Sequence, residues 1–328
     1  MFTQTALKNI KHGLLIFVTI SIMGSHALAA APRKVTIGYS TIGPMATGLW
    51  MAKEIGAFDR YGIQADLVYI SSGPVVAQAL IGGNLDAGLG ATNAVISAVL
   101  SGAPLMSVLS VANKAPMRLY VQPEIERVED LRGKSVGVTR FGSVTHNLTQ
   151  LLLRKHGLEE AVKIRQMGDS MAVSAAFEQG AIAGAVTSFL RVGAHVPQRL
   201  LLKFEETGIP YSMDVIVFSR DYHRRYSKTV EGIVRAYIEG IAALHQDKER
   251  ALQIVAKYMR VPDPRMWQIV YQDSVNFLEK IPRVEPEAVL SILEFLGKKE
   301  LPLKTFVDNS IVDRLIAEGF IDKLYTKR

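Results

Sequence analysis

The stretch Lys34-Val-Thr-Ile-Gly-Tyr39, followed by Ser40-Thr-Ile-Gly-Pro44, decides the fold of this 328-residue chain. The first run is typical of a β-strand. Gly43 and Pro44 then mark a turn into a helix with proline at its first position, which we expect to run to about Ile55. A strand that passes through a short loop into a helix is the repeating unit of an α/β sheet.

The same alternation continues on both sides of Arg118. Further strands are expected within 62–70, 83–90, 106–111, 119–121, 134–138, 162–166, 183–187, 200–204 and 215–218. Helices are expected at 75–81, 93–100 with Thr92 as its cap, 141–156, 171–179 and 188–196. This pattern predicts parallel sheets covered by helices on both faces. Beyond Ser219 only helices are expected, at 228–246, 248–259, 263–277, 285–296 and 309–318.

The N-terminus has the three parts of a secretory signal peptide. Lys8 and Lys11 precede an apolar run from Gly13 to Met23, and small residues follow at Ala27, Ala29, Ala30 and Ala31. The apolar run is about half of the roughly 20 residues that a transmembrane helix needs. We therefore expect residues 1–29 to be a signal peptide, cleaved after Ala29 or Ala31, and the mature protein to be periplasmic.

Composition excludes several classes of function. The chain has no cysteine, which excludes disulfides, thiolate metal sites, cysteine nucleophiles and a lipid anchor on cysteine. The net charge of +7 becomes +5 without the two leader lysines. The basic residues are scattered, and no stripe of basic and aromatic residues predicts nucleic-acid binding. An apolar fraction of 48% is enough for the packed cores of two domains.

Four loops are candidate ligand contacts, because ligands of open α/β sheets bind beyond the carboxyl ends of the strands. They are rich in glycine and hydroxyl residues, which offer backbone N–H groups and O–H donors at helix N-termini that favour anions. The alternative is that these hydroxyls only cap their helices. The candidates are Ser40, Thr41 and Gly43; Ala91, Thr92 and Asn93; Thr139, Gly142, Ser143 and Thr145; and Thr187 and Ser188.

Motifs of catalysis and metal binding are weak or missing. Gly133-Lys134-Ser135 imitates the end of a phosphate loop, but Val128 stands where the first glycine is required. The run from Gly88 to Asn93 is an incomplete dinucleotide fingerprint, and no G-x-S-x-G nucleophile motif occurs. The five histidines beyond the leader are dispersed without metal-ligand spacing. We expect no catalytic residue, no metal and no cofactor.

Several motifs in fixed order resemble the NitT/TauT family of substrate-binding proteins, over nearly all of the chain beyond the leader. They are Gly56-Ala-Phe58, Tyr61-Gly62-Ile63, Ala79–Gly88, Ser101-Gly-Ala-Pro104 and Glu129-Asp-Leu-Arg-Gly-Lys134-Ser-Val-Gly-Val138. The resemblance implies an α/β fold of the type II periplasmic binding protein class, in which two lobes close on a ligand, with C-terminal helices. It also implies that the four candidate loops are ligand loops.

By the same resemblance, lobe 1 comprises 33–117 and 214–328 and lobe 2 comprises 118–213. The implied function is solute binding for an ABC importer, as a monomer with a permease and an ATPase as partners. Alternatives are a binding protein for a thiamine-pyrimidine precursor, a thiamine-pyrimidine synthase, and a ligand-sensing module for a membrane receptor. The synthases carry a cysteine-rich motif that this chain lacks.

The ligand is expected to be a small organic anion. The third loop combines Arg140 and Phe141 with several hydroxyls, which favours a sulfonate or carboxylate head beside an apolar body. Trp50 and Phe189 are further candidates for the apolar wall, although each is also a typical core residue. Asp86 and Asp214 stand beside predicted strands, where they either orient a polar ligand or serve turns and caps.

Overall fold

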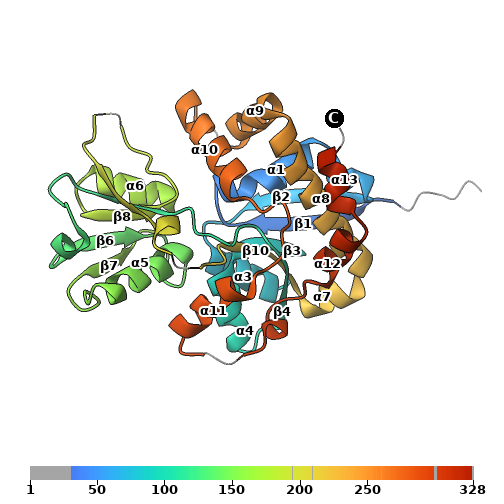
Figure 1. Cartoon of the computed structure of the whole chain (residues 1–328), viewed down its shortest axis with the longest axis horizontal. Helices are drawn as coiled ribbons and strands as arrows, with labels where there is room; N and C mark the ends of the chain where they lie inside the picture. Colours follow the sequence, from blue (N-terminus) through green and yellow to red (C-terminus); the bar gives the residue numbers. More distant parts are fainter. Residues whose placement is uncertain (1–30, 194, 209, 260, 299–300, 327–328) are drawn as a thin grey trace, which may run out of the picture. The chain divides into compact units, whose positions relative to one another are not determined.

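The computed structural model describes residues 31–193, 195–208, 210–259, 261–298 and 301–326. The expected signal peptide, residues 1–29, lies outside the described residues. The described residues from Pro32 onward form one compact unit that contains two five-stranded sheets (Figure 1).

The first sheet has the strand order β2-β1-β3-β10-β4. β1 pairs in parallel with β2 and β3, whereas β10 runs antiparallel to both β3 and β4. The sequence pattern predicted a parallel sheet, and the observed sheet is mixed, because β10 enters it from a later part of the chain and runs in the opposite direction. The strands are β1 Arg33–Tyr39, β2 Ile63–Tyr69, β3 Ala87–Ala91, β4 Leu105–Ser110 and β10 Asp214–Ser219.

The second sheet has the order β7-β6-β8-β5-β9 and is also mixed. β6 is parallel to β7 and β8, and β5 is antiparallel to β8 and β9. Helices α5 (Val144–Lys155) and α6 (Ser170–Glu178) both pack on β6 and β8 (Figure 1). The strands are β5 Arg118–Val121, β6 Ser135–Val138, β7 Lys163–Gln166, β8 Gly184–Thr187 and β9 Arg199–Lys203.

The remaining helices pack on the first sheet or on one another, and the predicted helical C-terminal region is confirmed. Among the described residues, none of the helices is both long and apolar enough to cross a bilayer. These helices are α1 Thr47–Glu54, α2 Ala57–Arg60, α3 Gly73–Ile81, α4 Thr92–Leu100, α7 Arg220–Arg225, α8 Ser227–Gln246, α9 Lys248–Met259, α10 Pro264–Phe277, α11 Pro286–Phe295, α12 Ser310–Ala317 and α13 Phe320–Thr326, with 3-10 turns η1 Pro44–Ala46, η2 Val128–Leu131, η3 Phe204–Glu206 and η4 Leu303–Thr305.

Two local predictions were wrong. In the segment expected as a helix at 188–196, the described residues, 188–193 and 195–196, have no helical structure. Its polar groups are satisfied elsewhere, since Thr187 Oγ1 donates to Phe189 O at 3.0 Å and Arg191 N donates to Ser174 Oγ at 3.1 Å. Thr92 does not cap α4 but is its first residue, and its hydroxyl lies 3.0 Å from Ser212 Oγ.

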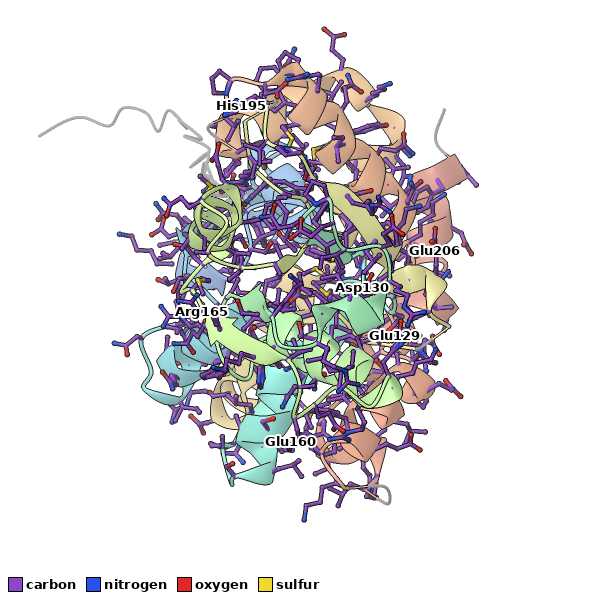
Figure 2. The ribbon with its side chains drawn as sticks, turned by 90° about the vertical axis from the view of Figure 1, so that its left-hand side faces the viewer. Glu129, Asp130, Glu160, Arg165, His195 and Glu206 are labelled. Atoms are coloured by element: carbon purple, nitrogen blue, oxygen red, sulfur yellow. The ribbon has the colours of Figure 1, made fainter. Side chains whose placement is uncertain are left out.

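The Glu129–Val138 motif has a structural role in this fold. The Asp130 carboxylate accepts hydrogen bonds from the backbone N–H groups of Glu126 and Arg127, both at 3.0 Å, at the start of η2. Glu129 Oε1 lies 2.8 Å from His156 Nδ1 at the end of α5. Glu129 and Asp130 are labelled in Figure 2. The motif thus joins the loop before β6 to the far end of the helix after it.

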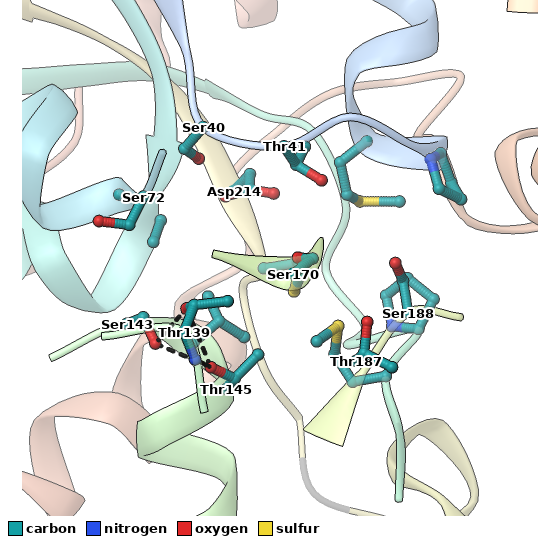
Figure 3. Close-up of a pocket in the computed structure, with 18 of the residues that line it drawn as sticks. Ser40, Thr41, Ser72, Thr139, Ser143, Thr145, Ser170, Thr187, Ser188 and Asp214 are labelled. Atoms are coloured by element: carbon teal, nitrogen blue, oxygen red, sulfur yellow. Dashed lines mark hydrogen bonds between the residues drawn. The ribbon is translucent and has the colours of Figure 1, made fainter. Parts of the chain in front are cut away.

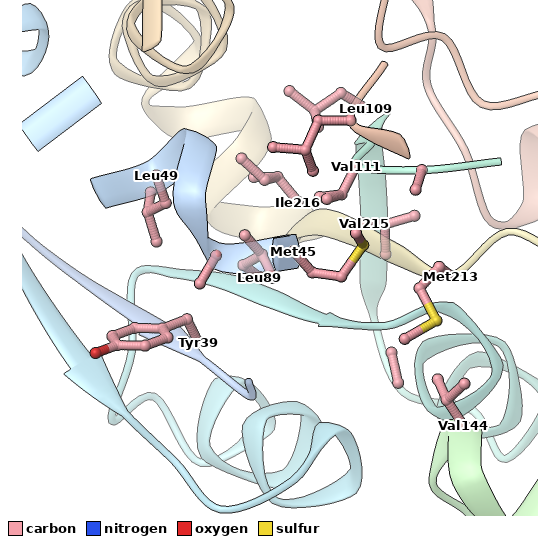
Figure 4. Close-up of a cluster of buried hydrophobic side chains, with 14 of the residues drawn as sticks. Tyr39, Met45, Leu49, Leu89, Leu109, Val111, Val144, Met213, Val215 and Ile216 are labelled. Carbon is pink, nitrogen blue, oxygen red and sulfur yellow. The ribbon is translucent and has the colours of Figure 1, made fainter. Parts of the chain in front are cut away.

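The centre of the first sheet is its most buried part. Every residue of β3 and β4 is buried, and side chains of β3, β4 and β10 pack together with η1 (Figure 4). Full burial of each large aliphatic side chain stabilises the fold by about 1.5–3 kcal/mol. Met45 and Met213 belong to this core and also line the cavity described below. The cavity therefore has a packed wall on this side.

Helices α1 and α8 approach each other closely at two glycines, Gly48 and Gly240. A Cβ atom on Gly240 would lie 2.4 Å from Gly48 O and 2.7 Å from Ala52 N. These are backbone atoms of α1, so the helices would have to separate to make room.

We expect Gly240→Ala to lower the free energy of unfolding by about 1–3 kcal/mol, although alanine is the better helix former by about 1 kcal/mol. Urea unfolding followed by circular dichroism measures the loss. Gly232→Ala in the same helix is the matched control, because its Cβ would meet side-chain atoms of Ile63 and Tyr61 at 3.0 Å, and a shift of a few tenths of an ångström would relieve both contacts. Equal losses for both variants would contradict the close-approach argument.

Candidate ligand pocket

A cavity of about 70 Å³ lies where loops of both sheets meet (Figure 3). One water needs roughly 10–15 Å³ on the same measure, so the space suits a small solute. Hydroxyl groups and apolar side chains share the lining. The lining residues are Ser40, Thr41, Pro44, Met45, Ser71, Ser72, Gly73, Ala91, Pro116, Met117, Thr139, Ser143, Val144, Thr145, Ser170, Thr187, Ser188, Met213 and Asp214.

The cavity brings together eight of the twelve predicted site residues: Ser40, Thr41, Ala91, Thr139, Ser143, Thr145, Thr187 and Ser188. Gly43, Thr92, Asn93 and Gly142 do not line it. Asn93 instead donates from Nδ2 to Gly142 O at 2.8 Å, a bond that links α4 to the loop before α5. Gly43 packs against the ring of Phe189, which would lie 3.0 Å from a Cβ at that position.

The hydroxyls of the third loop bond mainly to one another. Thr139 Oγ1 donates to Ser143 Oγ at 3.0 Å, and Thr145 Oγ1 lies 2.9 Å from Ser143 Oγ and accepts from Thr139 N at 3.0 Å. Ser143 also caps α5, because its Oγ accepts from His146 N at 3.3 Å. The capping interpretation therefore holds for Ser143, and this cluster shapes one wall of the cavity (Figure 3).

Other hydroxyls of the lining have no side-chain hydrogen bond to any described residue: Ser40, Thr41, Ser72, Ser170 and Ser188. Ser72 Oγ is fully buried and is without a partner among these residues. A buried hydroxyl without a hydrogen bond costs about 1–3 kcal/mol, which a ligand can recover by bonding to it.

Three helices begin at the cavity. Ser72 and Gly73 start α3, Ser143 and Val144 start α5, and Ser170 starts α6. Their N-terminal N–H groups give this part of the wall a positive potential. At the fourth loop, Thr187 and Ser188, the expected helix N-terminus is missing, because the described residues between β8 and β9 are not helical.

Sequence reasoning missed the contribution of Ser71–Gly73 and of Ser170. Ser71–Gly73 follow β2 and lead into α3, and Ser170 follows β7 and begins α6. The rule that ligands bind beyond the carboxyl ends of strands could therefore have predicted both stretches. Pro116 and Met117 were missed because nothing in their types indicates a ligand contact.

The cation and the rings expected at the site lie elsewhere. Arg140 does not line the cavity, and its Nη2 donates to Ser71 Oγ at 3.1 Å. Phe141 is 55% exposed, Trp50 is in the core and stacks on Tyr258 with ring centroids 5.0 Å apart, and Phe189 is buried outside the lining. The apolar surface is instead supplied by Pro44, Met45, Pro116, Met117, Val144 and Met213.

Residues 44–251 match the family described as NMT1/THI5 like. The chain belongs to this family. The predicted resemblance to the NitT/TauT substrate-binding proteins is confirmed by this family match together with the sulfonate- and nitrate-binding relatives described next. A putative aliphatic sulfonates-binding protein of Escherichia coli (strain K12) is 24% identical to this NMT1/THI5-like chain over 258 residues, which cover 77% of this chain and 78% of the relative.

Solved structures show the fold. The alkanesulfonate-binding protein of Xanthomonas axonopodis pv. citri bound to MOPS has a TM-score of 0.66 at 21% identity, covering 82% of this chain and 92% of its own. The periplasmic nitrate-binding protein of Synechocystis PCC 6803 has a TM-score of 0.66 at 13% identity, covering 90% and 91%. The NMT1/THI5-like chain thus has the predicted α/β periplasmic binding protein fold.

The lining of the NMT1/THI5-like cavity combines hydroxyl groups, apolar side chains and one carboxyl group. Of the described residues that line it, none is Lys, Arg or His, and Asp214 is the one ionisable group. Elsewhere in the described residues, no three His, Asp or Glu side chains are placed to share a metal ion. The lining offers hydrogen bonds, helix N-termini and apolar contacts to a ligand.

Proposed function

We propose that this protein is the periplasmic solute-binding component of an ABC importer and that it does not act as an enzyme. The observation that carries the proposal is the small cavity whose hydroxyls, some without partners, come from loops of both sheets. The family and the sulfonate-binding relative support the same role. A permease and an ATPase are the partners that this role requires, and the N-terminal leader would direct export.

The two sheets are the proposed cores of two lobes, 33–117 with 214–328 and 118–213. The sheet membership supports this division, since β10 belongs to the sheet of β1–β4 and β5–β9 form the other. A ligand that contacts both lobes stabilises their closed arrangement, because only that arrangement allows all of its contacts. Closure would let the permease distinguish loaded from empty protein.

The proposed ligand is a small organic solute with a sulfonate- or carboxylate-like group. The N-termini of α3, α5 and α6 are suited to that group, and the methionine and proline side chains to an apolar body. Thermal unfolding against alkyl and aryl sulfonates, carboxylates, nitrate and thiamine pyrimidines tests the proposal. A solute at 100 times its Kd adds about 2.7 kcal/mol to the stability. No shift with any of them would contradict it.

We expect Ser72→Ala to weaken solute binding by about 0.5–1.5 kcal/mol without lowering the melting temperature of the empty protein. The reason is that Ser72 Oγ is buried without a partner, so its loss removes a ligand contact and no internal bond. Isothermal titration and differential scanning calorimetry measure the two effects.

Ser143→Ala is the matched control. Its hydroxyl caps α5, so the empty protein should lose about 1 kcal/mol of stability. If Ser72→Ala destabilised the empty protein as much as Ser143→Ala, Ser72 would have a structural role instead of a ligand contact.

A further inference from the structure

The carboxyl group of Asp214 is buried at the cavity and has no hydrogen bond or ion pair with any described residue. Asp214 is the first residue of β10, is 2% exposed and lines the cavity beside Ser40 and Thr41 (Figure 3). Its backbone is engaged, since Val111 N donates to Asp214 O at 2.8 Å. No described residue donates a hydrogen bond to its side chain.

Its ionisable neighbours do not neutralise it. Tyr211 and Tyr237 are both buried, and the negative charge of Asp214 adds to the burial that raises the pKa of each. Tyr211 Oη already donates to Asn147 Oδ1 at 2.7 Å, and Tyr237 Oη has no partner among the described residues. The described lining of the cavity thus contains an acid and no cationic side chain.

A buried carboxylate without donors is costly, so an acid in such a place either stays protonated or receives a donor from outside. Burial raises the pKa of Asp214 to about 7, so both forms are accessible near neutral pH. In the ionised form it repels a solute's anionic group and attracts a cationic or N–H group. The helix N-termini of α3, α5 and α6 remain as the sites for a negative group.

We infer that the solute carries a hydrogen-bond-donating nitrogen, an ammonium or an N–H group, and that Asp214 accepts its hydrogen bond and thereby selects the solute class. This inference rests on the proposed function and adds a second recognition element to it. It makes Asp214 a specificity-determining residue, while the hydroxyls and helix N-termini hold the remainder of the solute.

Matched solute pairs test the inference on the purified protein by thermal shift and isothermal titration. One pair is 2-aminoethanesulfonate and propane-1-sulfonate, and another is 4-aminopyrimidine and 4-methylpyrimidine; in each, a nitrogen donor is replaced by a methyl group. Comparing the two pairs also shows whether the preferred nitrogen donor is an alkylammonium group or the amino group of a pyrimidine. We expect the nitrogen-bearing member of one pair to bind roughly 10- to 150-fold more tightly than its partner.

Asp214→Asn should sharply reduce this preference, because an amide keeps the shape but replaces the negative acceptor with a neutral group that carries one acceptor oxygen and one N–H donor. Asp169→Asn is the control: Asp169 caps α6 beside Ser170 but does not line the cavity, and asparagine caps equally well. It removes one nearby negative charge and should preserve the preference.

Tighter binding of the nitrogen-free member, or unchanged selectivity in Asp214→Asn, would overturn the inference. If the protein bound sulfonates without a nitrogen but not their nitrogen-bearing partners, the inference on Asp214 would be overturned and the proposed function would still be supported. Absence of any shift across all pairs would count against both. A melting transition of Asp214→Asn at pH 7.5 confirms that the variant is folded.

Discussion

Asp273→Ala is expected to lower the free energy of unfolding by about 3–5 kcal/mol, the cost of removing one partner of a buried ion pair. Arg118, at the start of β5, reaches Asp273 on α10 through two contacts of 3.0 Å, Nη2 to Oδ1 and Nη1 to Oδ2. Their side chains are 13% and 9% exposed. Burial alone would lower the pKa of Arg118, but the hydrogen bond and charge of Asp273 outweigh burial and raise it.

Two controls identify the cause of the loss. Replacing both partners, as Arg118→Met with Asp273→Leu, should be far less costly, because no unpaired charge remains in the interior. Glu159→Ala, which breaks the exposed Arg154–Glu159 pair, should cost less than about 1 kcal/mol. Chemical denaturation at constant pH measures all three. If the double variant lost as much stability as Asp273→Ala, packing and not the charge would explain the effect.

The same pair should influence ligand binding. Arg118 Nη1 also donates to the backbone oxygen of Ser188, which lines the cavity. Asp273 therefore acts on the fourth loop through Arg118 and not by touching the solute. The double variant, expected to be nearly as stable as the natural protein, should still bind solute more weakly, because Ser188 loses its anchor.

The parts of the fold that depend on local pattern could be predicted from the sequence. The strand Lys34–Tyr39 was expected and β1 spans Arg33–Tyr39; the helix 248–259 matches α9 at both ends. The hydroxyl loops after β1, β6 and β8 were predicted by one rule, that ligand loops follow the carboxyl ends of strands. That rule depends only on strand order along the chain, so it needed no tertiary information.

Features set by tertiary contacts could not be predicted. β10 enters the first sheet after the chain has passed through the second sheet, and it runs antiparallel to β3 and β4. The alternation of apolar and polar residues that predicts a strand does not indicate in which direction that strand runs in its sheet. The segment 188–196 was expected to be helical, yet Arg191 N donates to Ser174 Oγ and Phe189 O accepts from Thr187 Oγ1. Arg140 donates to Ser71, a residue 69 positions away in the sequence. The sequence of the third loop alone therefore could not predict that Arg140 lies outside the cavity lining.

Asp214→Asn should also change how stability depends on pH. The pKa of Asp214 is raised by burial from 3.8 to about 7, so the folded protein holds a proton that the unfolded chain releases near pH 4. The stabilisation from this proton is complete below about pH 4 and is lost as the pH rises to 7. A shift of this size corresponds to about 4 kcal/mol.

Asparagine does not titrate, so the variant should be more stable than the natural protein at pH 8, by up to about 4 kcal/mol, and this advantage should disappear near pH 4. Calorimetric unfolding of both proteins from pH 4 to 8 measures the difference. Burial also raises the pKa values of Glu205 and Glu279, but both residues are present in both proteins and cancel in the comparison. A pH-independent difference would mean that Asp214 is ionised throughout and has a donor in the protein. A solute that donates a hydrogen bond to Asp214 should lower its pKa, so solute binding should remove most of the pH dependence from the natural protein and none from the variant.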